Sequence, residues 1–318
     1  MILENSLRYR FLNLMESKMK VWLNGGFVDL DKANVNIFSH SFSRGSAIFE
    51  VFDIVATKKG PAFFGLNQHI DRLFKSAELI CMDLPMSRKE IVDACLSTAR
   101  ENKVRNGAAK LFIYYPGIEF TAVPQNPQVE MAVFCVDYET FGIHQEDLSA
   151  PVQVGISSYK KYHSDTVPIQ AKVTGNYVNA FLAMTEIRRK GYEDVIILDI
   201  FGNVTEGATA SLFFVKDGKL RTARLANVLN GITRMVVLEV AADVGIPVEE
   251  TDILSEELFN MDEAFYSVSL EHIKPIRSIE KYQLGSKCPG PITQKIIDGM
   301  KPVYSGESKK SGKWLVFI

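Results

Sequence analysis

The chain has 318 residues, of which 47% are apolar and 23% charged, and these are the proportions of a globular protein long enough for two domains. Thirty-six basic and 38 acidic residues leave a formal net charge of -2. This balance argues against a nucleic-acid-binding protein, because such proteins need a surplus of Lys and Arg to face phosphates. No apolar run approaches the roughly 18 residues that suggest a membrane-spanning helix.

The four cysteines are far apart and form no C-x-x-C pair, and the five histidines are equally dispersed. We therefore expect no metal site, and free thiols in a reducing compartment. Residues 1–18 contain Glu4 and Glu16 among basic residues and lack an uninterrupted apolar region, so they resemble neither a secretory signal nor a good transit peptide. We interpret them as an N-terminal extension of a cytoplasmic protein.

Residues 19–140 alternate between strand and helix patterns and are expected to form a smaller α/β domain. Asn24-Gly25-Gly26 separates two short apolar runs, which is typical of a hairpin. Ser87 and Glu90 match a helix capping box. The expected elements are a hairpin at 20–30, a strand at 49–56, helices at 66–80 and from 87, and strands at 108–115 and 129–136.

Residues 141–150 are polar and poor in apolar side chains, and Pro151 follows them, so we expect a linker there. Residues 151–318 are expected to form a larger domain. Gly191 is typical of a helix C-terminus, and Asp217-Gly218 is typical of a hairpin turn. The expected elements are strands at 152–157, 195–199, 210–215 and 265–269, and helices at 176–190 and from 231.

Four short segments carry residue types suited to chemistry. A lysine precedes a Gly-Asn pair at 171–177, a glutamate follows a turn at 203–207, an arginine lies on a helix at 69–73, and Gly-Ile-Thr opens a helix at 231–234. Each segment alone is typical of a surface turn or of a solvated helix face. Their order and spacing, taken together, indicate a function.

Together these segments resemble the class IV aminotransferases, the fold-type IV pyridoxal-phosphate enzymes that include branched-chain and D-amino-acid aminotransferases and aminodeoxychorismate lyase. The resemblance covers roughly residues 20–278 and is densest at 157–212, where the Lys-x-x-Gly-Asn-Tyr string at 172–177 looks most like the branched-chain members. It implies a two-domain fold of mixed α+β and α/β character, like that of D-amino-acid aminotransferase. In such a fold the cofactor, pyridoxal 5'-phosphate, lies between a smaller N-terminal and a larger C-terminal domain.

The resemblance gives three residues a role at the cofactor ring. Lys172 matches the catalytic lysine, whose amine forms a Schiff base with the cofactor and later carries a proton. Glu206 matches the carboxylate that keeps the pyridine nitrogen protonated. Tyr177 matches the tyrosine that hydrogen-bonds the phenolic oxygen. A protonated ring withdraws electrons from the substrate α-carbon, as transamination requires.

The cofactor phosphate needs positive charge and backbone amides. A helix N-terminus offers unpaired N–H groups and a favourable dipole, so the helix that opens at Gly231-Ile232-Thr233 is a candidate anion site. In the family the amides at the positions of Ile232 and Thr233 bind the phosphate, together with the arginine at Arg72 and a hydroxyl at Ser269. His69 is expected to be structural.

The residues that select the substrate match the family less well. Branched-chain members usually carry Phe-Glu-Gly-Ile-Arg where this chain has Phe-Glu-Val-Phe-Asp from Phe49, which is nearer to the D-amino-acid branch. The strand arginine of the branched-chain members is expected to fall at Phe112. The D-amino-acid branch has its own arginine after a strand, where this chain has Tyr-Tyr-Pro-Gly at 114–117, so neither usual carboxylate anchor is found. We therefore predict Arg44 as a replacement anchor, with Tyr159 and Phe49 lining the substrate pocket.

Three functions remain open on this reading. The first is transamination of a branched-chain or other apolar amino acid with a 2-oxo acid such as 2-oxoglutarate. The second is a lyase of the aminodeoxychorismate type, or a D-amino-acid aminotransferase, on the same scaffold. The third is a protein that binds pyridoxal phosphate without catalysis, which the missing anchors suggest. By resemblance the chain is expected to form a homodimer. Its balanced charge and its lack of a long apolar run predict no nucleic-acid or membrane partner.

Overall fold

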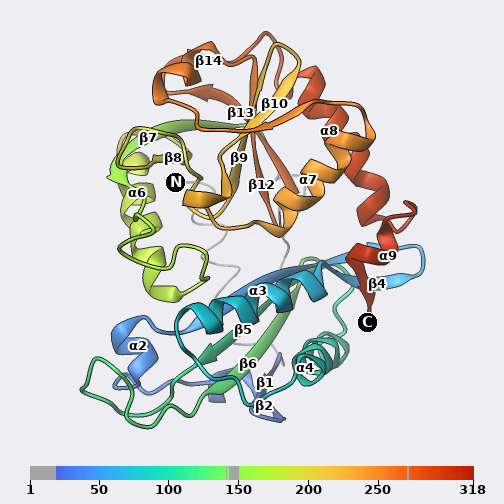
Figure 1. Ribbon diagram of the computed structural model, residues 1–318. Coiled ribbons are helices and arrows are strands. Elements are labelled where there is room, and N and C mark those ends of the chain that lie inside the picture. Colours follow the sequence, from blue (N-terminus) through green and yellow to red (C-terminus); the bar gives the residue numbers. More distant parts are fainter. Residues whose placement is uncertain (1–18, 141, 143–149, 271) are drawn as a thin grey trace. The chain divides into compact units, whose positions relative to one another are not determined.

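The computed structural model describes residues 19–140, 142, 150–270 and 272–318. The expected extension at 1–18 and most of the expected linker at 141–150 lie outside the described residues. The chain divides into two compact units (Figure 1). The first comprises the described residues of Met1–Gln145 with Ala171–Gly175 and Tyr304–Ile318, and the second those of Glu146–Gln170 with Asn176–Val303.

The first unit is a seven-stranded antiparallel sheet in the order β15-β4-β3-β5-β6-β1-β2. Its strands are β1 Lys20–Leu23, β2 Gly26–Asp29, β3 Ile48–Thr57, β4 Gly60–Phe64, β5 Gly107–Tyr114, β6 Glu130–Asp137 and β15 Leu315–Phe317. Its helices are η1 Leu30–Lys32, α2 His40–Arg44, α3 Leu66–Leu79, α4 Arg88–Glu101 and α9 Ser311–Trp314. The hairpin predicted at 20–30 is present, with β1 paired to β2.

Helices α3 and α4 cover one face of this sheet (Figure 1). The apolar stripe predicted for 66–80 is buried there, with Leu66, Ile70 and Leu73 packed against β3 and β5. The predicted capping box starts α4, since the side chain of Ser87 accepts from the amide of Glu90 and the Glu90 carboxylate accepts from the amide of Ser87. Because successive strand residues alternate between faces, the side chains of Phe49, Lys110 and Phe112 lie on the other face.

The second unit is built on an eight-stranded mixed sheet in the order β11-β10-β9-β12-β13-β7-β8, with β14 paired to β13. Its strands are β7 Val152–Lys160, β8 Asp194–Leu198, β9 Ser211–Lys216, β10 Lys219–Thr222, β11 Val248–Glu250, β12 Glu263–Val268, β13 His272–Ile279 and β14 Tyr282–Gln283. Its helices are α6 Tyr177–Arg189, η3 Leu225–Asn227, α7 Ile232–Asp243, η4 Ser255–Asn260 and α8 Pro291–Tyr304. The short η2, Thr174–Asn176, spans the boundary between the two units.

The C-terminal tail differs from the expected domain division, which assigned all of 151–318 to the second domain. Strand β15 pairs with β4 of the first sheet, with Leu315 opposite Phe64. The ring of Phe64 also stacks on Trp314 at 5.9 Å. The tail therefore belongs to the first unit, because its backbone and its largest buried side chain both find their partners there.

Residues 172–175 also pack within the first unit, although they follow the start of the second unit in sequence. The carbonyl of Lys172 accepts from the amide of Phe49 at 3.1 Å, and the amide of Thr174 donates to Ala47 at 2.8 Å. The amide of Gly175 donates to the carbonyl of Gly45 at 2.8 Å. These hydrogen bonds hold residues 172–175 alongside the beginning of β3. The first sheet therefore fixes the backbone of Lys172.

This pairing depends on a close approach of two glycines. Gly45 has a φ of +68°, and a Cβ added to it would lie 2.7 Å from Cα of Gly175. Replacing Gly45 with Ala should therefore destabilise the fold by about 2–4 kcal/mol, because both the backbone strain and the contact oppose a methyl group. Chemical denaturation measures the change.

Gly25→Ala is the matched control, because Gly25 also has a positive φ, +94°, but open space around its Cβ position. It should cost only about 1 kcal/mol. Equal losses in the two variants would show that the contact with Gly175 contributes nothing.

Candidate functional site

The amine of Lys172 lies beside an aromatic ring of the first sheet. Its Nζ is 4.9 Å from the ring centroid of Phe49, the residue predicted to line the substrate pocket. The backbone amide of Lys172 donates to Oγ of Ser76 at 2.9 Å, which ties the segment to α3. Strand β3 and helix α3 therefore place this residue jointly, and they bring Phe49 and Lys172 together.

On the helix-covered face of the same sheet, a fully buried carboxylate organises two side chains of α3. The carboxylate of Glu50 accepts from Nε of Arg72 at 2.8 Å and from Nη2 of Arg72 at 2.6 Å. Nδ1 of His69 lies 2.7 Å from the same carboxylate, and the imidazole packs edge-on to Phe52. The bidentate geometry fixes the plane of the guanidinium, so the arginine predicted to hold the phosphate is rigidly oriented.

These contacts set the charges of the cluster. Burial alone would raise the pKa of Glu50, but the positive charge and the hydrogen bonds of Arg72, helped by His69, outweigh it and hold the pKa at about 2. Burial lowers the pKa of His69 below its usual value despite Glu50, and the positive charges of Arg72 and Lys172 add to this effect. The cluster thus holds one carboxylate, Glu50, against one permanent cation, Arg72.

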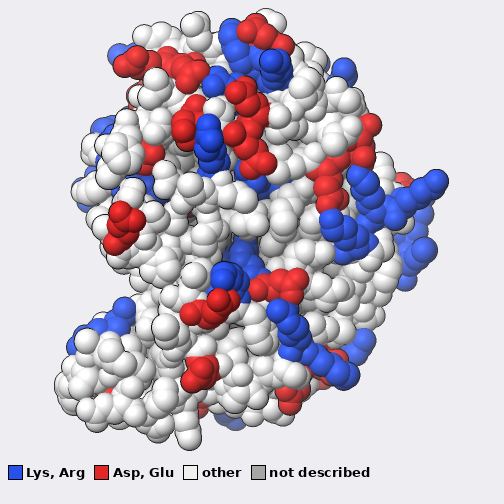
Figure 2. Space-filling view, viewed as in Figure 1, with Lys and Arg blue, Asp and Glu red and all other residues white. Residues whose placement is uncertain are grey.

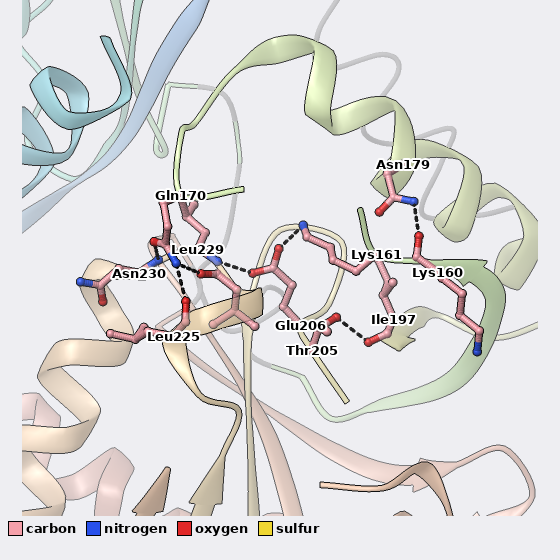
Figure 3. Close-up of polar contacts among 11 residues, drawn as sticks. Lys160, Lys161, Gln170, Asn179, Ile197, Thr205, Glu206, Leu225, Leu229 and Asn230 are labelled. Atoms are coloured by element: carbon pink, nitrogen blue, oxygen red, sulfur yellow. Dashed lines mark hydrogen bonds and ion pairs between the residues drawn. The ribbon is translucent and has the colours of Figure 1, made fainter. Parts of the chain in front are cut away.

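In the second unit, Glu206 is held by a lysine and by a backbone amide (Figure 3). Oε1 of Glu206 makes a close ion pair with Nζ of Lys161, and Oε2 accepts from the amide of Leu229 at 3.2 Å. Both side chains of the ion pair are nearly buried. Burial would lower the pKa of Lys161, but the charge and the hydrogen bond of Glu206 raise it above its usual value, and Tyr177 adds to this.

The Thr-Glu-Gly motif places Glu206 by pairing with the strand beside it. The amide of Thr205 donates to the carbonyl of Ile197 at 3.0 Å and its hydroxyl to the same oxygen at 2.7 Å, while the carbonyl of Glu206 accepts from the amide of Ile197. Glycine is required next, because a Cβ on Gly207 would lie 2.6 Å from the buried ring of Tyr266. The carboxylate is therefore presented from a rigid segment.

A single glutamine fixes the chain that leads into α7. The side-chain amide of Gln170 donates to the carbonyls of Leu225 and Val228, and its oxygen accepts from the amide of Asn230 at 3.3 Å (Figure 3). Leu229 lies within this stretch and donates to Glu206. Gln170 and Glu206 together therefore position the N-terminus of α7.

That helix N-terminus has the chemistry of an anion site. Ile232 and Thr233 are buried, no side chain caps the helix, and across the described part of the chain their amides have no hydrogen-bond acceptor. Buried N–H groups of a first turn need an acceptor, and a phosphate supplies one that the helix dipole also favours. The residues present thus fit a phosphorylated cofactor.

The remaining predicted residues lie as follows. Tyr177 is the first residue of α6, and its effect on Lys161 places it in the surroundings of Glu206. Tyr159 lies exposed near the end of β7, and Ser269 is half-buried in the turn after β12. Arg44 ends α2 and donates to the carbonyl of Phe120 at 3.1 Å.

Sequence reasoning does not identify three residues of the site. Sequence reasoning finds Glu50 only as part of a motif, and it does not find Lys161 or Lys110. For Lys110 a signal is present, since it is the one charged residue in the strand Gly-Ala-Ala-Lys-Leu-Phe-Ile-Tyr. A charge within such a strand indicates either an exposed position or a functional one.

Two further observations bear on the class of site. The described ranges contain no group of three or more His, Cys, Asp or Glu side chains that could hold a metal ion. Among the helices that the structure describes, none has the length and apolar character needed to cross a bilayer.

The Glu50 cluster should make stability depend on pH. The pKa of Glu50 falls from an ordinary 4.5 to about 2 on folding, so its contribution to stability is complete above about pH 4.5 and is lost as the pH falls toward 2. Replacing Glu50 with Gln should lower the free energy of unfolding at pH 7 by about 3–5 kcal/mol, because Arg72 loses its buried partner. Denaturant titrations between pH 7 and 3 measure the difference, which should shrink as the pH falls.

Glu78→Gln is the matched control, because Glu78 pairs with Lys75 on the exposed surface of the same helix. That variant should change stability by less than about 1 kcal/mol at every pH. A Glu50→Gln loss that stays constant down to pH 3 would contradict the assigned charge state.

Comparison with known proteins agrees with the motifs. The model of the family described as amino-transferase class IV matches residues 48–279. The chain is 30% identical over 297 residues to the branched-chain-amino-acid aminotransferase of Escherichia coli (strain K12), covering 93% of this chain and 96% of the relative. It is 29% identical to that of Pseudomonas aeruginosa, with 94% and 97% covered.

Solved structures give the same result. The branched-chain aminotransferase of Thermoproteus uzoniensis, crystallised with norvaline, has a TM-score of 0.89 at 32% identity and covers 94% of this chain and 99% of its own. The T.th. branched-chain enzyme, complexed with N-(5'-phosphopyridoxyl)-L-glutamate, has a TM-score of 0.88 at 27% identity, with 95% and 99% covered. The expected fold type IV and the expected pyridoxal phosphate cofactor are confirmed. The chain therefore belongs to the class IV aminotransferases.

Proposed function

We propose that this enzyme transfers the amino group of a branched-chain or other apolar amino acid to a 2-oxo acid such as 2-oxoglutarate, in two half-reactions. The observation that carries the proposal is the agreement of relatives over more than nine-tenths of the chain, each described as a branched-chain aminotransferase. One solved relative holds norvaline and another a phosphopyridoxyl derivative of L-glutamate, and these are the two substrate types that such a cycle needs.

The surroundings of Lys172 support an apolar substrate. Phe49 and Phe112 face each other across β3 and β5 with ring centroids 5.8 Å apart, and Nζ of Lys172 rests on the first of them. Aromatic walls gain free energy from burying an aliphatic side chain and offer nothing to a small polar one. Phe49 and Tyr159 are the residues we assign to the side-chain pocket.

Lys172 is assigned the covalent attachment of the cofactor and the movement of a proton from the substrate α-carbon. Bound pyridoxal phosphate supplies an electron-withdrawing ring that stabilises negative charge at that carbon. Glu206 would hold a proton at the ring nitrogen, and its ion pair with Lys161 fixes the position of its carboxylate. Tyr177 would donate to the phenolic oxygen.

The phosphate is assigned to the amides of Ile232 and Thr233, with Arg72 and the hydroxyl of Ser269. The buried, uncapped start of α7 supports the first two, and the fixed plane of the guanidinium supports Arg72. Arg44 remains our predicted anchor for the substrate carboxylate. It is exposed and already donates to Phe120, so it would have to exchange a backbone acceptor for a carboxylate.

A second candidate activity is favoured by one feature. The string that begins at Phe49 continues with Glu and Val, as in the D-amino-acid branch, and lyases of the aminodeoxychorismate type share the scaffold. A half-reaction screen with single amino acids of both hands separates these functions, because bleaching of the cofactor's visible band by L-leucine and not by D-alanine supports our proposal. Release of pyruvate without amino transfer would support a lyase, and no response to any amino acid would support a non-catalytic binding protein.

We also propose a homodimer. Six large apolar side chains are exposed together where α2 and the loop after β5 run side by side, and this region is largely uncharged in Figure 2. They are Ile37, Phe38, Phe42, Ile118, Phe120 and Val123. A surface of this kind is typical of a protein interface, and a second copy is the partner we assign to it.

Elsewhere on the viewed face acidic and basic side chains are intermixed (Figure 2). This mixture supports the expectation of no nucleic-acid or membrane partner. The four cysteines are free, which supports a cytoplasmic location.

Replacing Lys172 with Ala should abolish turnover, and it should also abolish the fixation of cofactor to the chain by borohydride, because both are assigned to its amine. Transfer of the amino group from L-leucine to 2-oxoglutarate and the mass of the reduced protein measure the two effects. Lys160→Ala, which removes an exposed lysine from β7, should retain both. Retained turnover in the Lys172 variant would refute the assignment.

Replacing Phe120 with Asp should convert the dimer to a monomer, because a charge would lie within the apolar surface. Light scattering after size-exclusion chromatography measures the mass. Phe317→Asp is the control, because Phe317 is also exposed but lies on β15, away from this surface. A dimer that persists in the Phe120 variant would place the interface elsewhere.

A further inference from the structure

Strand β5 carries a half-buried lysine whose amine lies on the same aromatic ring as that of Lys172. Nζ of Lys110 is 5.0 Å from the ring centroid of Phe49 and 4.6 Å from that of Phe112. Nζ of Lys172 is 4.9 Å from the Phe49 centroid, so the two nitrogens are at most about 10 Å apart. Both amines therefore lie against the same aromatic ring.

The sheet register fixes this arrangement. Phe49 is opposite Phe112, and Val51 is opposite Lys110, so the four side chains share the face opposite α3 and α4. Lys110 cannot move to the helix-covered side without a shift of the whole strand register, which would turn Leu111 out of the core. The lysine is held near Lys172 by the fold itself.

Among the residues that the structure describes, Lys110 has no counter-ion to neutralise it. Within the ranges that the structure describes, no carboxylate lies within 4 Å of its amine, and its contacts are the faces of the two rings. Burial lowers the pKa of Lys110, and the charge of Lys172 lowers it further. Coulomb repulsion is mutual, so a positive charge on Lys110 also opposes one on Lys172.

The other charged groups around these two amines come from α3 and β3. His69 and Arg72 approach from α3, and the charge of Lys172 lowers the pKa of His69. Glu50 on β3 is already engaged by Arg72 and His69 on the opposite face. Asp53 lies two strand positions beyond Val51, on the same face as Phe49. Lys110 is the cation that shares the ring with Lys172.

We propose that Lys110 is a positioning residue that keeps the amine of Lys172 uncharged at neutral pH. The inference rests on the proposed role of Lys172. An uncharged amine is needed both to attack a carbonyl and to accept a proton, and a neighbouring cation in a desolvated site is a known way to obtain one. Lys110 acts through Lys172 and need not touch the reacting atoms.

The test measures the protonation of Lys172 directly, in the full chain freed of cofactor. Trace acetylation across pH 6–11, read at the Lys172 peptide by mass spectrometry, gives the midpoint at which the amine becomes reactive. In Lys110→Met the midpoint should rise by about one pH unit, as expected for a unit charge removed from this distance. In Lys110→Arg, which keeps the charge, it should stay within a few tenths of a unit.

Lys59→Met is the matched control, because it removes an exposed lysine from the turn between β3 and β4 and should leave the midpoint unchanged. Melting curves show whether each variant is folded. If Lys110→Met is not folded, Lys110→Gln takes its place. In the enzyme loaded with cofactor, the acid limb of the pH profile of kcat should shift to higher pH in Lys110→Met, together with the acetylation midpoint. It should not shift in Lys110→Arg.

An unchanged midpoint in folded Lys110→Met or Lys110→Gln overturns the inference, and so does an equal rise in Lys110→Arg. Neither result affects the proposed function, which depends on loss of turnover in Lys172→Ala. If Lys172→Ala keeps its turnover, the proposed function fails even where the midpoint shifts as expected. The two failures are therefore distinguishable.

Discussion

The structure depends on the return of one short segment, 171–175, to a sheet that the chain has already left. Backbone bonds from Phe49 to Lys172 and from Gly175 to Gly45 hold this segment, and the approach is so close that a side chain at Gly45 would collide with Gly175. Because Tyr177 begins a helix of the second unit directly afterwards, very little chain separates the lysine from that unit. The proposed catalytic lysine is thereby mounted on paired backbone rather than on a free loop, which limits the positions its amine can reach.

Each unit stabilises a buried carboxylate in the same way, by pairing it with a cation. Glu50 is paired with Arg72, and Glu206 with Lys161, and in each case the ion pair is nearly buried. A buried pair is weak evidence of stability in itself, but it fixes the orientation of both partners. A carboxylate held in this way has a fixed orientation, which supports the proposed role of Glu206 at the ring nitrogen.

Much of the local structure could be predicted because its causes are local. The Ser87 capping box, the Asp217-Gly218 turn and the apolar stripe of α3 each depend on residues within a few positions of one another, and each is found as predicted. The tail could not be predicted, because β15 pairs with β4 from the far end of the sequence and a strand of three residues carries almost no pattern. The proposed role of Lys110 could not be predicted either. Its own strand shows only an isolated charge, and the ring that it shares with Lys172 is brought to it by a neighbouring strand and by the returning segment.

The choice of lysine rather than arginine at position 110 has a consequence of its own. An arginine stays charged at every accessible pH, whereas a lysine whose pKa is lowered by burial can release its proton. Two lysines on one ring then titrate as a coupled pair, in which the second proton binds more weakly than the first. With both amines charged, the face of the sheet would hold two partly desolvated cations, which the aromatic rings stabilise only in part. The second proton on the pair is therefore bound more weakly than it would be on a separate lysine, and this is the effect on which the proposed role of Lys110 rests.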